Sequence, residues 1–156
     1  MANNIGSNIY IKLKGPADEL IQMLNELEKD NKWEEVVLYD FGYTHYPEKN
    51  WIEIRFQTKG LDIRSFSDNL YLSFTNVIEE LIYEYADNDD YSFGGKYVYN
   101  DLVLTEYELD IEFFDDITYY NDQFEMEDIE EDDYVDEPEI EDYYTQTNVD
   151  KLNEVN

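Results

Sequence analysis

"NIYIKLKGPADELIQMLNELEK", Asn8–Lys29, decides the fold class because its hydrophobic pattern changes period part-way along. Residues 8–14 alternate apolar and polar side chains, the period-2 pattern of a strand with one buried face (Ile9, Ile11, Leu13). The residues that follow place apolar side chains at helical spacing (Leu20, Met23, Leu24, Leu27). Pro16 suits a first helical turn, and Asp18 and Glu19 suit the positive end of a helix. The stretch predicts a strand followed directly by a helix.

Similar patterns continue along the chain. Strands are predicted over Glu34–Gly42 and Trp51–Thr58, the latter with a period-2 pattern, and a helical pattern, "LDIRSFSDNLYLSF", follows Gly60. Asn76–Ala86 predicts a strand with a helical alternative, because Glu79-Glu80 breaks its alternation. Gly42 and the region around Pro47 indicate a loop.

Two further segments, "SFGGKYVYND" and "LVLTEYELDIEFF", predict a terminal hairpin that turns at Asn100-Asp101. The order is strand, helix, strand, strand, helix, strand and then a hairpin. This order predicts an α+β fold, a ferredoxin-like antiparallel sheet with two helices on one face, an extra C-terminal hairpin and an acidic C-terminal arm. We expect a domain over residues 1–110 and an acidic, aromatic-containing segment over residues 111–156.

The run "LSFTNVIEELIYEYADNDDYSFGGKYVYNDLVLTEYEL" resembles the YubB-type ferredoxin-like domain of phages and mobile elements. The residues that carry the resemblance are Leu72-Ser73 before a strand, Tyr83-Glu84 within it, the Phe93-Gly94-Gly95 turn and the closing hairpin Tyr97–Glu108. The Trp51 strand and the start "MANNIGSNIYIKLKG" also fit, so the resemblance covers roughly residues 1–110. It implies a fold and a phage-like origin, but no catalytic residues.

Composition favours a folded chain in spite of its charge. The 156 residues are 42% hydrophobic, with 16 Tyr, 8 Phe and 2 Trp, whereas disordered acidic chains are poor in aromatic residues. There is no cysteine, which excludes disulfides, thiolate metal sites and cysteine nucleophiles. The sequence shows no signal-peptide pattern and no apolar run of the ~20 residues that a membrane helix needs. We therefore expect a cytoplasmic protein, in the host cytoplasm if it is phage-encoded.

Charge is the most unusual property of the chain. With 40 acidic and 10 basic residues, the formal net charge is −30. Residues 101–156 hold 22 of the acids and one base, Lys151, and no base lies between Lys96 and Lys151. Such a chain repels nucleic acids and anionic membranes, so we expect no direct contact with either. A basic surface, such as the groove of a nucleic-acid-binding protein, is the expected partner.

Few residues point to catalysis, cofactors or metals. His45 is the single histidine, and we expect an ordinary surface residue in a loop. Gly94-Gly95 lacks phosphate-loop spacing and favours a bulge or tight turn. Calcium loops starting at Asp87 or Asp89 fail, because position 6 is not glycine or position 3 is not a ligand. We predict no enzyme activity, no cofactor and no dedicated metal site.

The stretch "FEMEDIEEDDYVDEPEIEDYY", Phe124–Tyr144, is the candidate functional segment. One interpretation is a solvated, solubilising tail, because charge runs usually repel and stay unfolded. The eight aromatic residues between Phe113 and Tyr144 argue against a simple spacer, and "ELDIEFF" continues a strand-like period from the predicted hairpin. Acids at every second residue are about as closely spaced as DNA phosphates, at ~3 Å on a helix or ~6.6 Å on a strand.

We therefore expect a phage or mobile-element DNA mimic that blocks the basic nucleic-acid-binding groove of a host defence protein, a CRISPR or restriction nuclease. The alternative is a non-enzymatic interaction module whose acidic arm docks a basic partner without mimicry. The predicted partner-binding residues are Asp115, Asp116, Asp122, Glu125, Glu127, Asp128, Glu130, Glu131, Asp132, Asp133, Tyr134, Asp136, Glu137, Glu139, Glu141 and Asp142.

Overall fold

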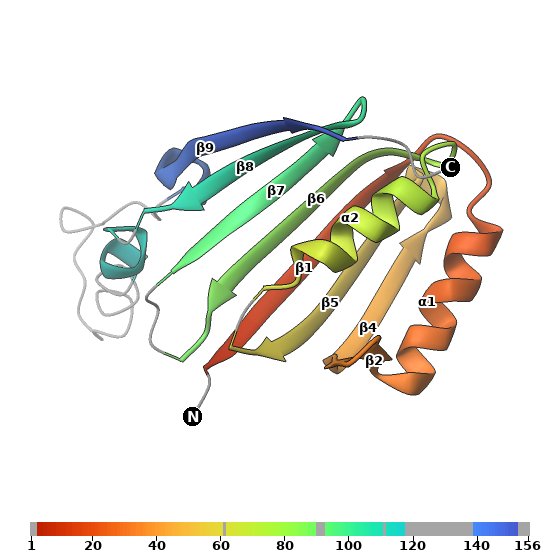
Figure 1. The fold of residues 1–156 in the computed structure, drawn as a ribbon, viewed down its shortest axis with the longest axis horizontal. Helices are drawn as coiled ribbons and strands as arrows, with labels where there is room; N and C mark the ends of the chain where they lie inside the picture. Colours follow the sequence, from red (N-terminus) through yellow and green to blue (C-terminus); the bar gives the residue numbers. More distant parts are fainter. Residues whose placement is uncertain (1–2, 61, 90–92, 111, 118–138, 153–156) are drawn as a thin grey trace, which may run out of the picture.

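The computed structural model describes residues 3–60, 62–89, 93–110, 112–117 and 139–152. This part of the chain is an α+β protein with a seven-stranded antiparallel sheet and three helices (Figure 1). The strand order in the sheet is β4-β5-β1-β6-β7-β8-β9. The strands are β1 (Asn4–Leu13), β4 (Tyr39–Tyr46), β5 (Trp51–Lys59), β6 (Ile78–Asp87), β7 (Gly94–Asn100), β8 (Val103–Leu109) and β9 (Tyr144–Lys151). The helices are α1 (Asp18–Asp30), α2 (Arg64–Ser73) and the helical residues 112–117.

The strand predicted from residue 8 is confirmed as part of β1, which lies between β5 and β6. Buried and more exposed residues alternate along β1, and Ile5, Ile9 and Ile11 are fully buried. Ile9 is paired with Ile54 on one side and with Tyr83 on the other. Because β1 pairs on both edges, its register fixes the positions of both neighbouring strands.

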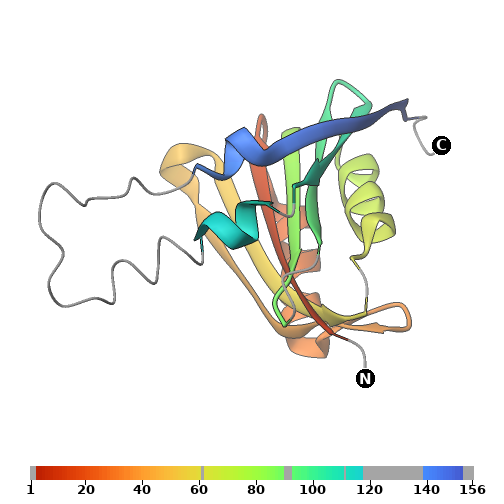
Figure 2. The same ribbon diagram turned by 90° about the vertical axis from the view of Figure 1, so that its left-hand side faces the viewer.

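Both predicted helices are confirmed. In α1, Leu20, Leu24 and Leu27 are buried, and Met23 is partly buried against the same core. In α2, Phe66 and Leu70 enter that core beside the inward side chains of β1 and β5. The two helices therefore cover the same face of the sheet, the helix face, and Figures 1 and 2 show them there. The opposite face is the open face.

The strand predicted over Glu34–Gly42 is wrong in its placement. Glu34 has a positive φ and lies in the turn of a small hairpin formed by β2 (Lys32–Trp33) and β3 (Val36–Val37). The long strand β4 begins only at Tyr39. The predicted loop at Gly42 is also wrong, because Gly42 is inside β4 and is paired with Arg55 of β5. His45, predicted in a loop, is likewise a half-buried strand residue opposite Ile52.

The connection predicted around Pro47 is confirmed. A short 3-10 helix, η1 (Pro47–Lys49), makes the connection to β5. The predicted strand Glu34–Gly42 ends too early because Gly42 is a local turn signal. Aromatic and β-branched residues continue through Tyr43–Tyr46, and their pairing with β5 outweighs that signal.

The terminal hairpin of β7 and β8 is confirmed, with its turn at Asp101-Leu102, one residue later than predicted. Both turn residues have positive φ, at 50° and 60°. The strand pattern of "ELDIEFF" does not continue, because β8 ends at Leu109 and residues 112–117 are helical. The helical turn buries Phe114, which is 7% exposed.

After residue 138 the chain returns to the sheet. A 3-10 helix, η3 (Ile140–Tyr143), leads into β9, which pairs antiparallel with β8 from Leu109↔Tyr144 to Val103↔Lys151. The division into residues 1–110 and 111–156 stays a prediction, but β9 belongs to the same sheet as β8. No described helix is long and apolar enough to cross a membrane.

Tyrosine hydroxyls on the helix face are satisfied inside the core. The Tyr83 hydroxyl bonds with Ser7 Oγ at 2.9 Å and accepts from the Ile63 amide at 3.1 Å. The Tyr97 hydroxyl donates to Asp62 Oδ2 at 2.6 Å, and the Tyr99 hydroxyl to Asp68 Oδ1 at 2.5 Å. Burial raises the pKa of Tyr83, Tyr97 and Tyr99 above the ordinary value of 10.0. Hydrogen bonds to carboxylates raise it further in Tyr97 and Tyr99.

We predict that stability falls steeply above pH 10. A raised pKa means that the folded state holds the phenolic proton more tightly than the unfolded chain. The contribution is complete below pH 10 and is lost as pH climbs towards the folded-state pKa, by about 1.4 kcal/mol per pH unit for each such tyrosine. Urea unfolding at a series of alkaline pH values measures how the free energy of unfolding falls with pH. Tyr99→Phe should reduce that slope by the contribution of one tyrosine. A free energy of unfolding that stays flat above pH 10 would contradict the prediction.

Candidate functional site

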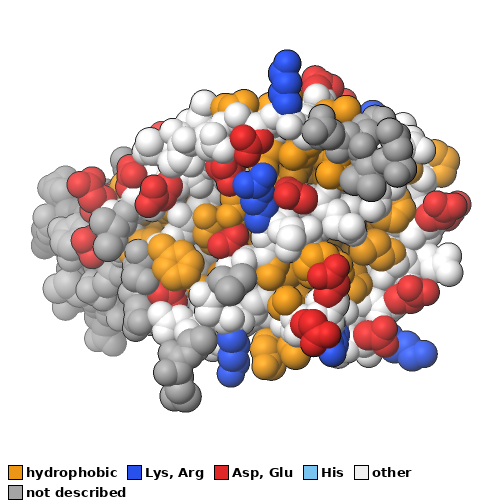
Figure 3. All heavy atoms as spheres, in the orientation of Figure 1, with side chains coloured by type: hydrophobic (Ala, Val, Ile, Leu, Met, Phe, Trp, Pro, Cys, Tyr) orange, Lys and Arg blue, Asp and Glu red, His pale blue; other side chains and the backbone are white. Residues whose placement is uncertain are grey.

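Six exposed carboxylates from two separate segments gather at one end of the sheet. We call this set the acidic ridge; it consists of Glu112, Asp115, Asp116, Glu139, Glu141 and Asp142. The first three belong to the helical residues 112–117, and the others lie in or next to η3. Figure 3 shows acidic side chains at this end of the molecule, and in Figure 2 the helical residues 112–117 lie across the sheet from α2.

Direct contacts hold the two segments of the ridge together. The Asp110 amide donates to the Tyr143 carbonyl at 2.9 Å, and the Tyr143 hydroxyl donates to Asp116 Oδ2 at 2.7 Å. The rings of Phe113 and Tyr143 lie 5.3 Å apart in an edge-to-face arrangement. The hydrogen bond to Asp116 raises the pKa of the exposed Tyr143 hydroxyl. The residues on either side of segment 118–138 are therefore joined at one place on the sheet.

Lys96 of β7 holds the C-terminal segment on the open face. Its ammonium nitrogen lies 2.9 Å from Glu141 Oε2, 4.3 Å from the ring centre of Tyr144 and 5.0 Å from that of Tyr107. The Lys96 side chain is 12% exposed, whereas the side chain of its partner Glu141 is 66% exposed. A cation over an aromatic face contributes about 0.5–1 kcal/mol when exposed and more when desolvated. Lys96 is therefore a principal anchor of η3 and the start of β9.

Arg64 of α2 holds the same C-terminal segment from the helix face. Its guanidinium lies 3.1 Å from Glu106 Oε1 of β8 and 3.4 Å from Asp150 Oδ2 of β9, and it also pairs with Asp68 at 3.4 Å. The Asn148 side chain donates to Glu106 Oε2 at 2.8 Å. One cation on each face of the sheet thus fixes β8 and β9.

Of the sixteen predicted site residues, the structure describes five: Asp115, Asp116, Glu139, Glu141 and Asp142. It brings all five together in the ridge. The other eleven lie outside the described residues; they are Asp122, Glu125, Glu127, Asp128, Glu130, Glu131, Asp132, Asp133, Tyr134, Asp136 and Glu137. Sequence reasoning missed Lys96 and Tyr143 as anchors, although Lys96 is the last base before the long acidic run.

The carboxylates do not converge on a point. Within the described ranges, no group of three or more His, Asp or Glu side chains is arranged to hold a metal ion. The ridge therefore offers separated negative charges, a geometry suited to a row of cations on another molecule.

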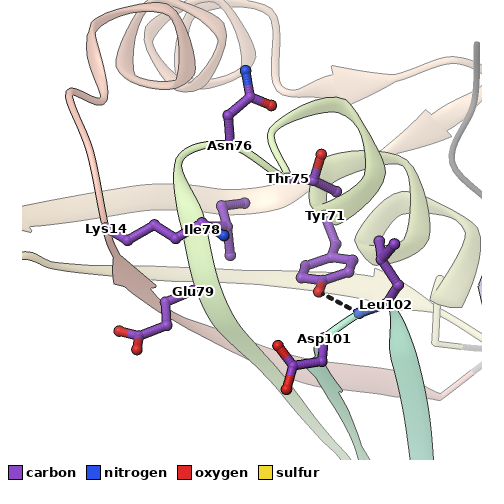
Figure 4. Close-up of a pocket in the computed structure, with 8 residues that line it drawn as sticks. All are labelled: Lys14, Tyr71, Thr75, Asn76, Ile78, Glu79, Asp101 and Leu102. Atoms are coloured by element: carbon purple, nitrogen blue, oxygen red, sulfur yellow. Dashed lines mark hydrogen bonds between the residues drawn. The ribbon is translucent and has the colours of Figure 1, made fainter.

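A hollow of about 640 Å³ lies away from the acidic ridge, between Lys14 after β1, the end of α2 and the β7–β8 turn (Figure 4). The bond drawn there joins the Leu102 amide, as donor, to the Tyr71 hydroxyl at 3.0 Å. Its charged side chains are Lys14, Glu79 and Asp101. Glu79 pairs with Lys12 of β1, whose Nζ lies 3.5 Å from Glu79 Oε2.

Comparison with known proteins places the chain in no family: no protein-family model, no curated protein and no solved structure matches it.

Lys96→Met should loosen η3 and β9 while leaving the rest of the sheet folded. The change removes one ion pair and two cation–aromatic contacts but keeps most of the side-chain volume. We expect amide hydrogen exchange in residues 144–151 to accelerate on the order of tenfold, which corresponds to about 1.4 kcal/mol.

Lys12→Met is the matched control, because Lys12 is 56% exposed and pairs with Glu79, away from β9. Exchange in β9 that is equally fast in both variants would show that Lys96 is not a specific anchor.

Proposed function

We propose that the protein is a DNA mimic, an acidic inhibitor that occupies the basic nucleic-acid-binding groove of a host defence protein such as a CRISPR or restriction nuclease. The observation that carries the proposal is the acidic ridge, whose carboxylates are exposed yet mounted on anchored elements of the sheet. The proposal includes a phage or mobile-element origin and a cytoplasmic location.

A ferredoxin-like core of the YubB type is part of the same proposal. The order β4-β5-β1-β6, with α1 in the connection from β1 to β4 and α2 in the connection from β5 to β6, supports it. A small sheet of this kind would serve as the scaffold that carries the acidic surface, and it supplies no chemistry of its own.

The spacing of the ridge resembles that of phosphates. In the helical residues 112–117, Glu112, Asp115 and Asp116 follow an i, i+3, i+4 pattern and so share one face. At 1.5 Å per residue, Asp115 and Asp116 lie roughly 4.5 and 6 Å from Glu112 along the axis, against about 3.4 Å between phosphates of one DNA strand. Lys and Arg side chains that grip successive phosphates can reach carboxylates at this spacing.

Few neighbouring cations neutralise the ridge. In the described part of the chain, Glu141 is the ridge residue that forms an ion pair, with Lys96. The intervening residues 118–138 add ten acidic residues and no Lys or Arg. The surface therefore keeps its charge for a partner, and a basic groove that binds it gains the same electrostatic attraction that it gains from DNA.

Anchoring favours an inhibitory surface over a solubilising tail. A tail needs no fixed geometry, whereas the ridge is held by the Tyr143–Asp116 hydrogen bond, by Phe113 and by Lys96. Charges that are already placed lose less conformational entropy on binding, so more of the interaction energy contributes to affinity.

The deciding experiment captures partners and then competes with DNA. The full-length protein is immobilised, exposed to a bacterial lysate at moderate salt and washed with duplex DNA or, in parallel, with poly-glutamate at equal charge. We expect captured nucleic-acid-binding proteins to elute with DNA, and also as salt rises from about 50 to 200 mM.

Recovery of no nucleic-acid-binding protein would overturn the proposed function. Captured proteins that resist DNA but elute with salt would instead indicate an interaction module that docks a basic partner without mimicry.

Charge removal in the ridge should weaken binding gradually. Exposed charges each contribute roughly 0.2–1 kcal/mol, so a single change should cost less than about fivefold in affinity. The combination Glu112→Gln, Asp115→Asn, Glu139→Gln and Asp142→Asn should cost on the order of tenfold or more. Titration of a captured partner by calorimetry measures both effects.

The matched control makes the same change in net charge on α1, where Glu19, Glu26, Glu28 and Asp30 are exposed. Equal losses in the two quadruple variants would mean that only total charge matters. Substitution is preferable to truncation after residue 110, because truncation would also remove β9.

A further inference from the structure

A pocket of about 200 Å³ lies on the open face next to the acidic ridge. Its lining comes from β1, from β6 and the residue after it, from the end of β8, from η3 and from the start of β9. These lining residues are Gly6, Asn8, Glu84, Tyr85, Ala86, Asn88, Leu109, Ile140 and Tyr144. Ile140 and Tyr144 flank the ridge residues Glu141 and Asp142 in the chain, so a partner on the ridge would reach the pocket directly.

Small residues create the floor of the pocket. Gly6 of β1 is paired with Ala86 of β6, which is paired with Gly94 of β7, so neighbouring strands carry little side chain there. A Cβ atom on Gly6 would lie 2.4 Å from Nδ2 of Asn88. The lack of a side chain at Gly6 therefore lets the Asn88 amide lie over the strand, at the edge of the pocket.

The polar groups of the pocket favour a ligand rich in hydrogen-bond donors. Glu84 supplies a carboxylate, and Asn8 and Asn88 supply amide oxygens. Glu84 is half-buried, and burial raises its pKa although Lys96 acts to lower it. A carboxylate that has lost part of its water gains more from a bound cation than an exposed one does.

The balance of charges around the pocket leaves room for one more cation. Glu84 is paired across the strands with Lys96, but the Lys96 ammonium is bonded to Glu141 at 2.9 Å. Two carboxylates thus share one ammonium, and the excess is negative. An anionic ligand is disfavoured for that reason, and among the lining residues that the structure describes a metal ion would find one carboxylate, that of Glu84.

The size and shape of the pocket further restrict the class of ligand that it can bind. A volume of about 200 Å³ is below the roughly 300–1,000 Å³ of sites for drug-sized molecules and cofactors. The Tyr144 ring already lies 4.3 Å from one cation and forms part of the wall. A planar guanidinium stacks on aromatic rings and presents five donors, which suits a wall of this kind beside a carboxylate and two amides.

We propose that this pocket, the Glu84 pocket, receives one arginine side chain of the basic partner that binds the acidic ridge. This inference rests on the proposed function and adds a specific anchor to it. The ridge would attract a basic surface over a distance, and the pocket would select the position at which one arginine is desolvated, as central anchor residues do in other interfaces.

The test uses Nα-acetyl-arginine methylamide as a probe, titrated into the full-length protein labelled with ¹⁵N. Nα-acetyl-citrulline methylamide, which has a similar shape and no charge, is the control ligand. We expect the arginine probe to shift the amide signals of Gly6, Ala86 and Ile140, and citrulline to leave them in place. Glu84→Gln should weaken the arginine probe about tenfold, as expected for the loss of a charged hydrogen-bond partner.

Two further variants make the result specific. Glu53→Gln removes another half-buried carboxylate, on β5 and outside the pocket lining, and should change the affinity less than twofold. Ala86→Leu keeps every charge and fills the floor, and it should abolish the shifts at Gly6 and Ile140. Spectra of each variant without the probe establish that it is folded, and either pocket variant suffices for the test.

Three outcomes would each overturn the proposal that the Glu84 pocket receives arginine. They are equal signal shifts with the citrulline control, an unchanged affinity for the arginine probe in a folded Glu84→Gln variant, and shifts confined to residues 112–117 and 139–142. Each of those outcomes leaves the DNA-competition experiment unaffected, so failure of the pocket and failure of the proposed function are distinguishable.

Discussion

The candidate surface depends on two cations that hold η3 and β9 against the sheet from opposite faces. Arg64 binds Glu106 and Asp150 from the helix face, and Lys96 binds Glu141 from the open face. Residues 101–156 carry 22 acids and a single base, so both cations must come from earlier in the chain. Without them, repulsion would favour an extended arm over a sheet strand.

The composition of β9 makes this arrangement possible. Its sequence, "YTQTNVDK", holds one acid and one base, in contrast to the dense acids before it. The register places neutral residues opposite the acids of β8, with Thr145 opposite Glu108 and Asn148 opposite Glu106. Like charges directly across a ladder destabilise a sheet, and this register avoids them at both positions. The acids are instead concentrated where the chain leaves and re-enters the sheet.

Hydrophobic patterns within short segments of the sequence correctly predicted the strands and helices that bury one continuous face. Alternation identified β1 and β5, and helical spacing identified α1 and α2, because each buries one continuous face. The errors occur where contacts distant in sequence decide. Gly42 marks a turn by composition, but pairing with β5 makes it a strand residue. Likewise "ELDIEFF" alternates as a strand would, yet burial of Phe114 and the contact between Phe113 and Tyr143 accompany a helical turn.

The same limit applies to the site. Five of the six ridge acids were predicted from the density of acids in the sequence, but Glu112 and the assembly of the ridge from two segments were not. Asp116 and Tyr143 are 27 residues apart, and Lys96 and Glu141 are 45 residues apart. Sequence spacing carries no signal for such pairs, although a lone base before a long acidic run is a reasonable candidate for an anchor.

Exposure separates the charges that stabilise the fold from those available to a partner. The Lys96 side chain is 12% exposed and the Arg64 side chain 35%, so salt screens these two cations less than it screens the exposed carboxylates of the ridge. Rising salt should therefore weaken a bound basic partner before it releases β9. A surface that keeps its shape while its attraction fades behaves as duplex DNA does in salt, because DNA also retains its structure when its ligands dissociate. A flexible acidic tail would lack that property, since nothing would hold its charges in a fixed arrangement.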